Sequence, residues 1–525
     1  MKNNRNRRFV LCNDGESLGG PANDAPMTKE KFIDVTLGPL KNTQIDTFYW
    51  QLGTDVFHGS PTLRYSDVYS HDTSAAPRWG EDMEAFNSSA DWRIYENTRS
   101  LIEQGNDPPK VLIEAGKDMG LEVFLSTRFN DVHDGITDTK EPYSSKKRDN
   151  PDWLLGPVSK PGISRSQSRF AYNFALPEVR EYKMELVYES IEKYDLDGWD
   201  WDFCRTVRFF PEGTEEKNID LITEMMRLVR SKLDEKGKRI NRKLALSVRV
   251  PPIIDTSKNY GLDVKTWIDE GLVDIVIAGV THGNMHRVPV EDLIESAKNT
   301  QTEVLVQNPG LFFWSRPYSS EILFNEPNVF TDEMCRAAAA TYWQAGIDGI
   351  YLWNNHLIEW CANANYNRGP WKEVADPNKI SKLNKHYLLD YDWESEGMST
   401  ELSGPTVPKA PLPAKLDKAG DSINLKMDIA DDPTDDSIKS VVFRILINNL
   451  TSLDVLDYKI NGTKIDHTKK HINYNQVNTK QTPKHTRTYT DIHTTHQPIH
   501  HTHTHNNTHA PLEQPTQLQP HSHKP

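Results

Sequence analysis

The chain has 525 residues, of which 36% are hydrophobic and 26% charged, and its formal net charge at pH 7 is -14. This length accommodates one large domain with an appendage, or a few domains of ordinary size. The acidic balance argues against a surface built to neutralise phosphate, so we do not expect nucleic acid as a partner.

Cysteine spacing and the N-terminus indicate the class of protein. The four cysteines follow no CxxC or zinc-finger spacing, so we expect neither a disulfide framework nor a structural metal, and no cofactor is indicated; they are Cys12, Cys204, Cys335 and Cys361. A basic start, residues 1–8, precedes the apolar run 9–12, which is too short for a signal-peptide core. No stretch approaches the roughly 20 apolar residues of a membrane span. We therefore expect a soluble protein with no export signal and no membrane partner.

From residue 9 to about 390, short apolar runs alternate with longer amphipathic segments. The runs predict strands at 9–12, 46–52, 122–129, 197–203, 244–250, 273–279, 303–307 and 347–353. Apolar stripes and capping residues predict helices at 28–40, 97–119, 179–194, 222–233, 290–299 and 331–346. Because no Gly-rich phosphate fingerprint follows the first strand, this α/β pattern favours a (β/α)8 TIM barrel over 1–395 rather than an open doubly wound sheet.

The composition changes after residue 395. Residues 396–420 contain a Pro-rich linker, and residues 421–465 form a small β-rich domain with expected strands at 423–427, 441–447 and 456–460. A unit of this size seldom folds alone, so we expect it to lean on the barrel or to be an incomplete β-sandwich. From 466 to 525 the chain is rich in Thr, Asn, Gln and His with few apolar residues, which predicts a disordered low-complexity tail.

The strand at 197–203 carries the strongest functional signal. Its period of two sends Gly198, Asp200 and Asp202 to one face, while Trp199, Trp201 and Phe203 take the other. The aromatic face would pack under helices, and the two carboxylates would line the interior of the barrel. Buried acids are costly unless partners or function compensate, so the end of this strand is the first place to expect chemistry.

Other strands also end in polar residues on the face expected to point inward. Active sites of TIM barrels lie at the C-terminal ends of the strands, so these residues are expected to meet at one mouth. The set expected to bind substrate is Arg128, Asn130, His133, Arg205, Arg249, His282, Trp353 and Asn355.

Each of these residues also has a structural interpretation. Arg128 and Arg249 are either counter-ions of a barrel carboxylate or direct substrate contacts. His133 and His282 taken singly are more typical of ordinary hydrogen-bonded histidines. Trp353 is either core or a platform for sugar rings.

Three segments resemble the glycoside-hydrolase-like family 10 barrels over roughly residues 100–360. They are Asn-Pro-Asp-Trp-Leu at 150–154, Tyr-Asn-Phe-Ala-Leu-Pro-Glu-Val-Arg at 172–180 and Tyr-Asp-Leu-Asp-Gly-Trp-Asp-Trp-Asp at 194–202. The resemblance implies a TIM-barrel glycosidase acting on a carbohydrate. More distantly, the last segment is similar to the fourth strand of α-amylase-type barrels, which implies that Asp202 is a nucleophile. It also resembles family 18 chitinases, but their acid-donating Glu would fall on Cys204.

The expected catalytic residues are Asp202, Asp200 and Glu359. Glycosidases use two carboxyl groups about 5 Å apart for retention or roughly 6.5–9.5 Å for inversion. Asp200 and Asp202 have Cα atoms about 6.5–7 Å apart on one strand, so separation alone allows either outcome. We expect Asp202 to be the nucleophile or base, and the proton donor is open among Asp200, Glu359 and Asp134. Because the two acids of a glycosidase usually come from different strands, the alternative is that Asp200 tunes or orients Asp202 through like-charge coupling. The fifth strand ends in Arg249, where an amylase-like barrel would be expected to present its acid nearby.

Two other classes of function remain open. The barrel can bind carbohydrate without cleaving it, with Arg128, His133 and Trp353 as the recognition set. A metal-dependent hydrolase using Asp131, His133 and His282 is weaker, since no HxH or HExxH spacing supports it.

Overall fold

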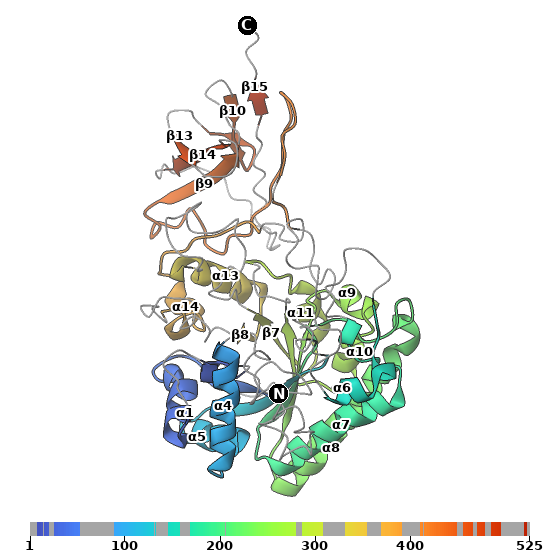
Figure 1. Cartoon of the computed structure of the whole chain (residues 1–525). Helices are drawn as coiled ribbons and strands as arrows, with labels where there is room; N and C mark the ends of the chain where they lie inside the picture. The colour runs from blue at the N-terminus through green and yellow to red at the C-terminus, as the bar shows by residue number, and fades with distance from the viewer. Residues whose placement is uncertain are drawn as a thin grey trace. The chain divides into compact units, whose positions relative to one another are not determined.

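A computed structural model of the chain shows a barrel of strands surrounded by helices, followed by a second, smaller β-rich unit (Figure 1). The two compact units are Met1–His386 with Trp393–Lys409, and Tyr387–Asp392 with Ala410–Pro525. The structure describes residues 8–13, 15–19, 26–52, 89–130, 132, 145–157, 169–204, 206–279, 286–307, 331–353, 369–390, 410–412, 414–448, 455–465, 470–477, 485–494 and 519–521.

The barrel is closed, and its eight parallel strands follow one another in chain order, with β1 paired to β8. The strands are β1 (Arg8–Asn13), β2 (Thr47–Leu52), β3 (Glu122–Arg128), β4 (Gly198–Asp202), β5 (Ala245–Val250), β6 (Ile275–Ala278), β7 (Glu303–Gln307) and β8 (Gly349–Trp353). All eight lie at nearly the residues that the apolar runs predicted. The TIM-barrel prediction is therefore confirmed.

The main helices between the strands lie on the outside of the barrel (Figure 1). They are α1 (Lys29–Leu37), α4 (Ser89–Glu103), α5 (Pro108–Asp118), α7 (Pro177–Lys193), α8 (Glu215–Ile240), α10 (Val264–Asp269), α11 (Glu291–Ala297) and α13 (Asp332–Ala345). Shorter helices are α6 (Ser145–Asp149), α9 (Ile254–Asn259) and α14 (Pro377–Ile380), with 3-10 turns at Glu16–Gly19, Gly38–Leu40, Pro151–Trp153 and Pro370–Lys372.

Capping residues set the ends of α13. The Thr331 side chain accepts a hydrogen bond from Met334 N, and Gly346 ends the helix in the left-handed conformation with φ 97.

The single helix expected at 97–119 is wrong in one respect, because the structure has two helices there. Gly105 adopts φ 78 and Pro108 begins α5, so the chain leaves α4 and starts again at a proline N-terminus.

The interior of the barrel is packed by side chains from alternate positions of the strands. This core cluster comprises Val10, Cys12, Tyr49, Phe124, Ile275, Ile277, Leu305, Tyr351 and Trp353. On β4 the opposite face packs outward, where Trp201 contacts Phe129 edge to face and Phe203 lies against Trp267 of α10. The expected alternation of aromatic and acidic residues on this strand is thus confirmed.

A cluster of ion pairs lies at the N-terminal ends of the barrel strands. Arg8 of β1 is 4% exposed. It donates from Nε to Glu303 Oε2 at 2.8 Å, from Nη1 to Thr47 Oγ1 at 3.2 Å, and also to Glu122. Three other strands therefore converge on one guanidinium, whose pKa is raised by the two carboxylates against the lowering effect of burial. Periodicity in the sequence does not predict this cluster.

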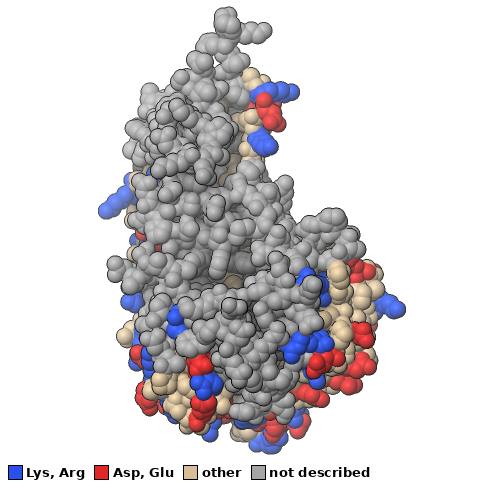
Figure 2. Space-filling view, in the orientation of Figure 1, with Lys and Arg blue, Asp and Glu red and all other residues tan. Residues whose placement is uncertain are grey.

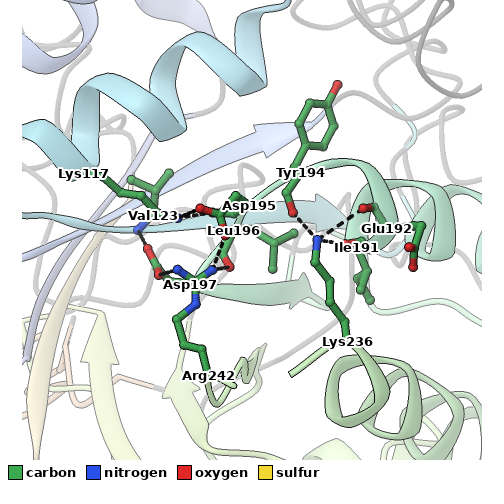
Figure 3. A network of polar contacts seen from close by, with 10 residues as sticks. All are labelled: Lys117, Val123, Ile191, Glu192, Tyr194, Asp195, Leu196, Asp197, Lys236 and Arg242. Carbon is green, nitrogen blue, oxygen red and sulfur yellow. Dashed lines mark hydrogen bonds and ion pairs between the residues drawn. The ribbon is translucent and has the colours of Figure 1, made fainter. Parts of the chain in front are cut away.

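A second network anchors the N-terminal end of β4 (Figure 3). Asp197 Oδ2 accepts a hydrogen bond from Val123 N at 2.9 Å, and Arg242 lies 3.4 Å from Asp197 Oδ1. Lys236 of α8 donates to the carbonyls of Ile191 and Tyr194 at the end of α7. Such a cation satisfies carbonyls that the helix end leaves without partners. Asp197 thus has a structural role, because its contacts hold the start of β4.

On the face shown in Figure 2, Lys and Arg side chains are interspersed with Asp and Glu over the described part of the barrel unit. Within the described residues, no helix is long and apolar enough to cross a membrane.

The second unit contains three small antiparallel groups of strands. The largest has the order β13 (Lys470–Val477), β14 (His485–Thr494), β9 (Val441–Asn448); β10 (Val455–Asp457) pairs with β15 (Gln519–His521), and β11 (Lys459–Ile460) with β12 (Thr463–Lys464). The Asn461-Gly462 turn joins β11 to β12 with φ values of 49 and 79, as a two-residue hairpin requires.

The strands of this unit differ in part from those expected from the sequence. The predicted strand at 423–427 is wrong, because the segment alternates in burial but makes no strand pairing. Strands β13 and β14 lie within the stretch whose composition predicts disorder; their Thr, Tyr and Ile residues favour strands despite the low apolar content. Residues 391–409, where the linker is expected to begin, lie outside the described part of the chain.

We predict that Arg8→Met lowers the free energy of unfolding by about 3–5 kcal/mol, because it leaves the Glu303 and Glu122 carboxylates without their cation at a buried position. Urea unfolding followed by circular dichroism measures the change. The matched control is Lys265→Met, which removes an exposed i,i+4 pair with Asp269 and should cost at most about 0.5 kcal/mol. Equal effects of the two substitutions would contradict a central role for Arg8.

Candidate active site

The structure describes six of the residues that the sequence predicted for the site. These are Arg128, Asn130, Asp200, Asp202, Arg249 and Trp353. The other predicted residues lie outside the described part of the chain: Asp131, His133, Asp134, Arg205, His282, Asn355 and Glu359. Strand register places Arg128 and Arg249 beside Asp202 on either side, at the C-terminal ends of β3, β4 and β5.

Asp202 forms a two-point ion pair with Arg249. Nε of Arg249 donates to Asp202 Oδ1 and Nη2 donates to Oδ2, each at 2.8 Å. Asp202 Oδ1 also accepts from the backbone N–H of Cys204 at 3.0 Å. Asp202 is 2% exposed, and the Arg249 side chain is fully buried. This geometry fixes the orientation of the carboxylate.

Arg249 extends the arrangement to two further strands. Its Nη1 donates to Gln307 Oε1 of β7 at 2.7 Å, and its guanidinium carbon lies 5.0 Å from the Trp353 ring centroid of β8. Gly279 makes room for the arginine, since a Cβ there would lie 2.5 Å from Arg249 Cγ. Arg249 therefore links Asp202 to the aromatic ring at the mouth, and in this structure it acts as a counter-ion.

Asp200 lies one inward position deeper in the barrel than Asp202 and is fully buried. The Ser126 hydroxyl donates to Asp200 Oδ2 at 2.6 Å. Burial raises the pKa of Asp200 to about 7, helped by the charge of Asp202, while the hydroxyls of Ser126 and Ser247 and the charge of Arg249 lower it. The two aspartates of β4 thus occupy different electrostatic environments.

Hydroxyl groups from neighbouring strands surround this level of the barrel. Ser126 and Ser247 stand opposite Asp200 in the strand register, and Tyr49 and Tyr351 contribute their rings to the same core. Among the described residues, the hydroxyls of Tyr49, Ser247 and Tyr351 and Oδ1 of Asp200 have no partner at hydrogen-bond geometry. So many polar atoms around one carboxyl are unusual for a packed core.

The carboxamide of Asn130 is committed to the backbone. It accepts from Tyr172 N at 2.9 Å and donates to the carbonyls of Tyr172 and Arg208. It therefore joins the end of β3 to two later segments. Its predicted contact with substrate stays a prediction.

Cys204 occupies the position of the acid in the chitinase comparison. Burial raises the pKa of its thiol far above the ordinary value, so the thiol is neutral at physiological pH. Its backbone N–H, rather than its side chain, contacts Asp202. Among the described residues, the side chain at this position provides no proton donor.

The predicted site did not include Gln307 or the hydroxyls around Asp200. Gln307 is the last residue of β7 on the inward face, and a polar residue at the end of an apolar strand is the signal that could have identified it. Ser126 and Ser247 were recognised as facing inward, but their proximity to Asp200 depends on strand register, which periodicity alone does not supply.

Comparison with solved structures finds distant likenesses to glycoside hydrolases of several kinds. The α-L-fucosidase isoenzyme 2 of Paenibacillus thiaminolyticus shares 12% identity with a TM-score of 0.39, over 71% of this chain and 48% of the fucosidase. The noncanonic maltogenic α-amylase AmyB of Thermotoga neapolitana shares 11% identity with a TM-score of 0.37, over 99% of this chain and 100% of the amylase. The PgaB glycoside hydrolase domain of Bordetella bronchiseptica shares 10% identity with a TM-score of 0.37, over 67% of this chain and 95% of the domain.

These likenesses concern the fold alone. The chain spans about half the length of the fucosidase that it matches. No family model and no curated protein matches the sequence. No particular family is assigned to the chain.

We predict that Arg249→Met lowers the free energy of unfolding by about 3–5 kcal/mol, because the buried Asp202 carboxylate then lacks its cation. The double variant Arg249→Met/Asp202→Asn should recover part of this loss, since it removes the uncompensated charge. Urea unfolding of the wild type, both single variants and the double variant completes the cycle. Strictly additive effects would show that the two side chains do not interact.

Proposed function

We propose that this barrel cleaves glycosidic bonds in an oligosaccharide or polysaccharide, with Asp202 as the nucleophile or base. The observation that carries the proposal is the placement of Asp202 at the C-terminal end of β4, facing inward and ion-paired at two points with Arg249. TIM-barrel enzymes perform their chemistry at this end of the strands.

The arrangement suits a reaction that develops positive charge. Glycoside hydrolysis passes through an oxocarbenium-like transition state, which an oriented carboxylate stabilises. Oδ1 of Asp202 accepts two hydrogen bonds and Oδ2 accepts one, so Oδ2 keeps a lone pair for an anomeric carbon or a water molecule.

A second carboxyl group must protonate the leaving group. Asp200 is too deep to touch a substrate in this conformation, because it is fully buried beneath Asp202. We assign the donor to Glu359 or Asp134, which follow β8 and β3 and lie outside the described residues. Trp353, close to Arg249 at the end of β8, supplies an aromatic face for a sugar ring.

The competing proposal is a barrel that binds carbohydrate without cleaving it. Arg249 at the end of β5 is consistent with this alternative as well, because its two hydrogen bonds to Asp202 reduce the nucleophilicity of that carboxylate. Trp353, Arg128 and His133 would then form the recognition set. A second carboxyl group within about 10 Å of Asp202 separates the two proposals, since hydrolysis requires one.

We predict that Asp202→Asn keeps the fold and abolishes turnover, because the isosteric amide retains hydrogen bonds but loses the negative charge. A screen of polysaccharides and aryl glycosides, read as released reducing ends or aryl groups, compares the wild type with this variant. The matched control is Asp269→Asn on the exposed helix α10, which should leave turnover unchanged.

The outcomes separate the proposals. Wild-type turnover that Asp202→Asn abolishes supports hydrolysis at this site. Unchanged turnover in the variant removes Asp202 from the mechanism. A wild type that binds glycans in the same screen but releases no product favours the binding alternative.

A further inference from the structure

We propose that Asp200 holds a proton at mildly acidic pH and releases it only near neutrality, and that it acts as a positioning residue beneath Asp202, so that the two aspartates of β4 together carry one negative charge while Asp200 is protonated. Its contribution to cleavage rests on the proposed function. Its proton does not, and can be tested without any substrate.

The geometry around Asp200 favours a neutral carboxylic acid. The side chain is fully buried, and the Ser126 hydroxyl donates to Oδ2 at 2.6 Å. Oδ1 has no partner at hydrogen-bond geometry among the described residues, while the Ser247 hydroxyl stands beside it on β5. An ionised Asp200 would be a fully buried charge with no cation from the described part of the chain in hydrogen-bond contact, whereas a neutral carboxylic acid needs no counter-charge.

None of the described hydrogen bonds and ion pairs joins a guanidinium to Asp200. Arg249 aims Nε and Nη2 at Asp202 and Nη1 at Gln307. A second buried anion next to Asp202 would pay the cost of desolvation and of like-charge repulsion with little compensation. The pKa of Asp200, raised by burial to about 7, agrees with this geometry.

Among the described residues, the other titratable or charged groups around Asp200 and Asp202 come from five strands and the segment after β4. They are Tyr49 of β2, Arg128 of β3, Asp202 of β4, Arg249 of β5, Tyr351 of β8 and Cys204. Burial raises the pKa of both tyrosines and of the cysteine, so these three are neutral near pH 7. Asp200 is therefore the member of this group that we expect to change charge near neutrality.

Ionisation of Asp200 has a consequence for Asp202. The new charge would lie two residues from Asp202 along the strand and would compete with it for Arg249. A neutral Asp200 lets Arg249 hold the Asp202 carboxylate in one orientation. Because the neutral Asp200 does not compete for Arg249, it helps to keep Asp202 in position.

The test compares melting temperatures of the wild type and Asp200→Asn between pH 4 and pH 9. The folded-state pKa of Asp200 is raised above its ordinary value of 3.8, so its stabilising effect is fully present below that value and is lost as the pH rises toward about 7. We expect the wild-type Tm minus the variant Tm to fall between about pH 4 and pH 7 and then to level off. A difference that is constant or rises with pH would overturn the proposal.

Ser126→Ala keeps the carboxyl and serves if Asp200→Asn does not fold. The Ser126 hydrogen bond lowers the pKa of Asp200, so its removal raises that pKa further. The wild-type Tm minus the Ser126→Ala Tm should be constant below about pH 7 and grow above it. A constant difference over the whole range would count against a titrating Asp200.

Turnover separates this inference from the proposed function. If the barrel is a glycosidase, kcat/KM of the wild type should decline as the pH rises through about 7, and the pH profile of Asp200→Asn should lack that decline. If no glycan is cleaved, the Tm comparison still decides whether Asp200 is protonated. Loss of all activity in a folded Asp200→Asn variant would instead show that Asp200 transfers a proton to substrate, and would overturn the positioning role.

Discussion

The Asp202–Arg249 ion pair is the interaction on which the mouth of this barrel depends. A charged group inside a protein is tolerated when a partner of opposite charge meets it with good geometry. Arg249 donates hydrogen bonds to both oxygens of Asp202, and its other described contacts are with Gln307 and the Trp353 ring. Four strands, β4, β5, β7 and β8, are joined through one guanidinium. Gly279 supplies the space that this side chain fills.

The same pair decides the state of the neighbouring acid. Because Arg249 is aligned with Asp202, Asp200 is left with hydroxyl groups instead of a cation. Two carboxyls on one face of one strand therefore take different roles, one charged near the mouth and one neutral below it. Glycosidases often separate the functions of their carboxyls through such differences in environment.

Ionic contacts close the barrel at its other end as well. Arg8 joins the starts of β2, β3 and β7 through Thr47, Glu122 and Glu303. Between the two ends lie the apolar side chains of the core cluster, among them Phe124 and Leu305. The packed interior of the barrel thus has buried arginines at both ends, Arg8 where the strands begin and Arg128 and Arg249 where they end.

Much of this fold follows from periodicity in the sequence. The alternation in 197–203 predicted that Asp200 and Asp202 point inward, because strand side chains alternate between two faces. Periodicity does not say which residues of different strands lie opposite one another. The pairing of Asp202 with Arg249 and of Asp200 with Ser126 follows from the register of β3, β4 and β5. The alternation at 423–427 predicted a strand that the structure does not contain. A strand forms only where a neighbouring strand pairs with it, and local alternation does not reveal that partner.

The central claim is that β4 carries one ionised and one protonated aspartate inside the barrel. The most direct measurement is 13C NMR of aspartate carboxyl groups in the whole protein at pH 6, assigned with Asp200→Asn and Asp202→Asn. The account predicts the resonance of a carboxylic acid for Asp200 and that of a carboxylate for Asp202. Two carboxylate resonances at that pH would contradict it.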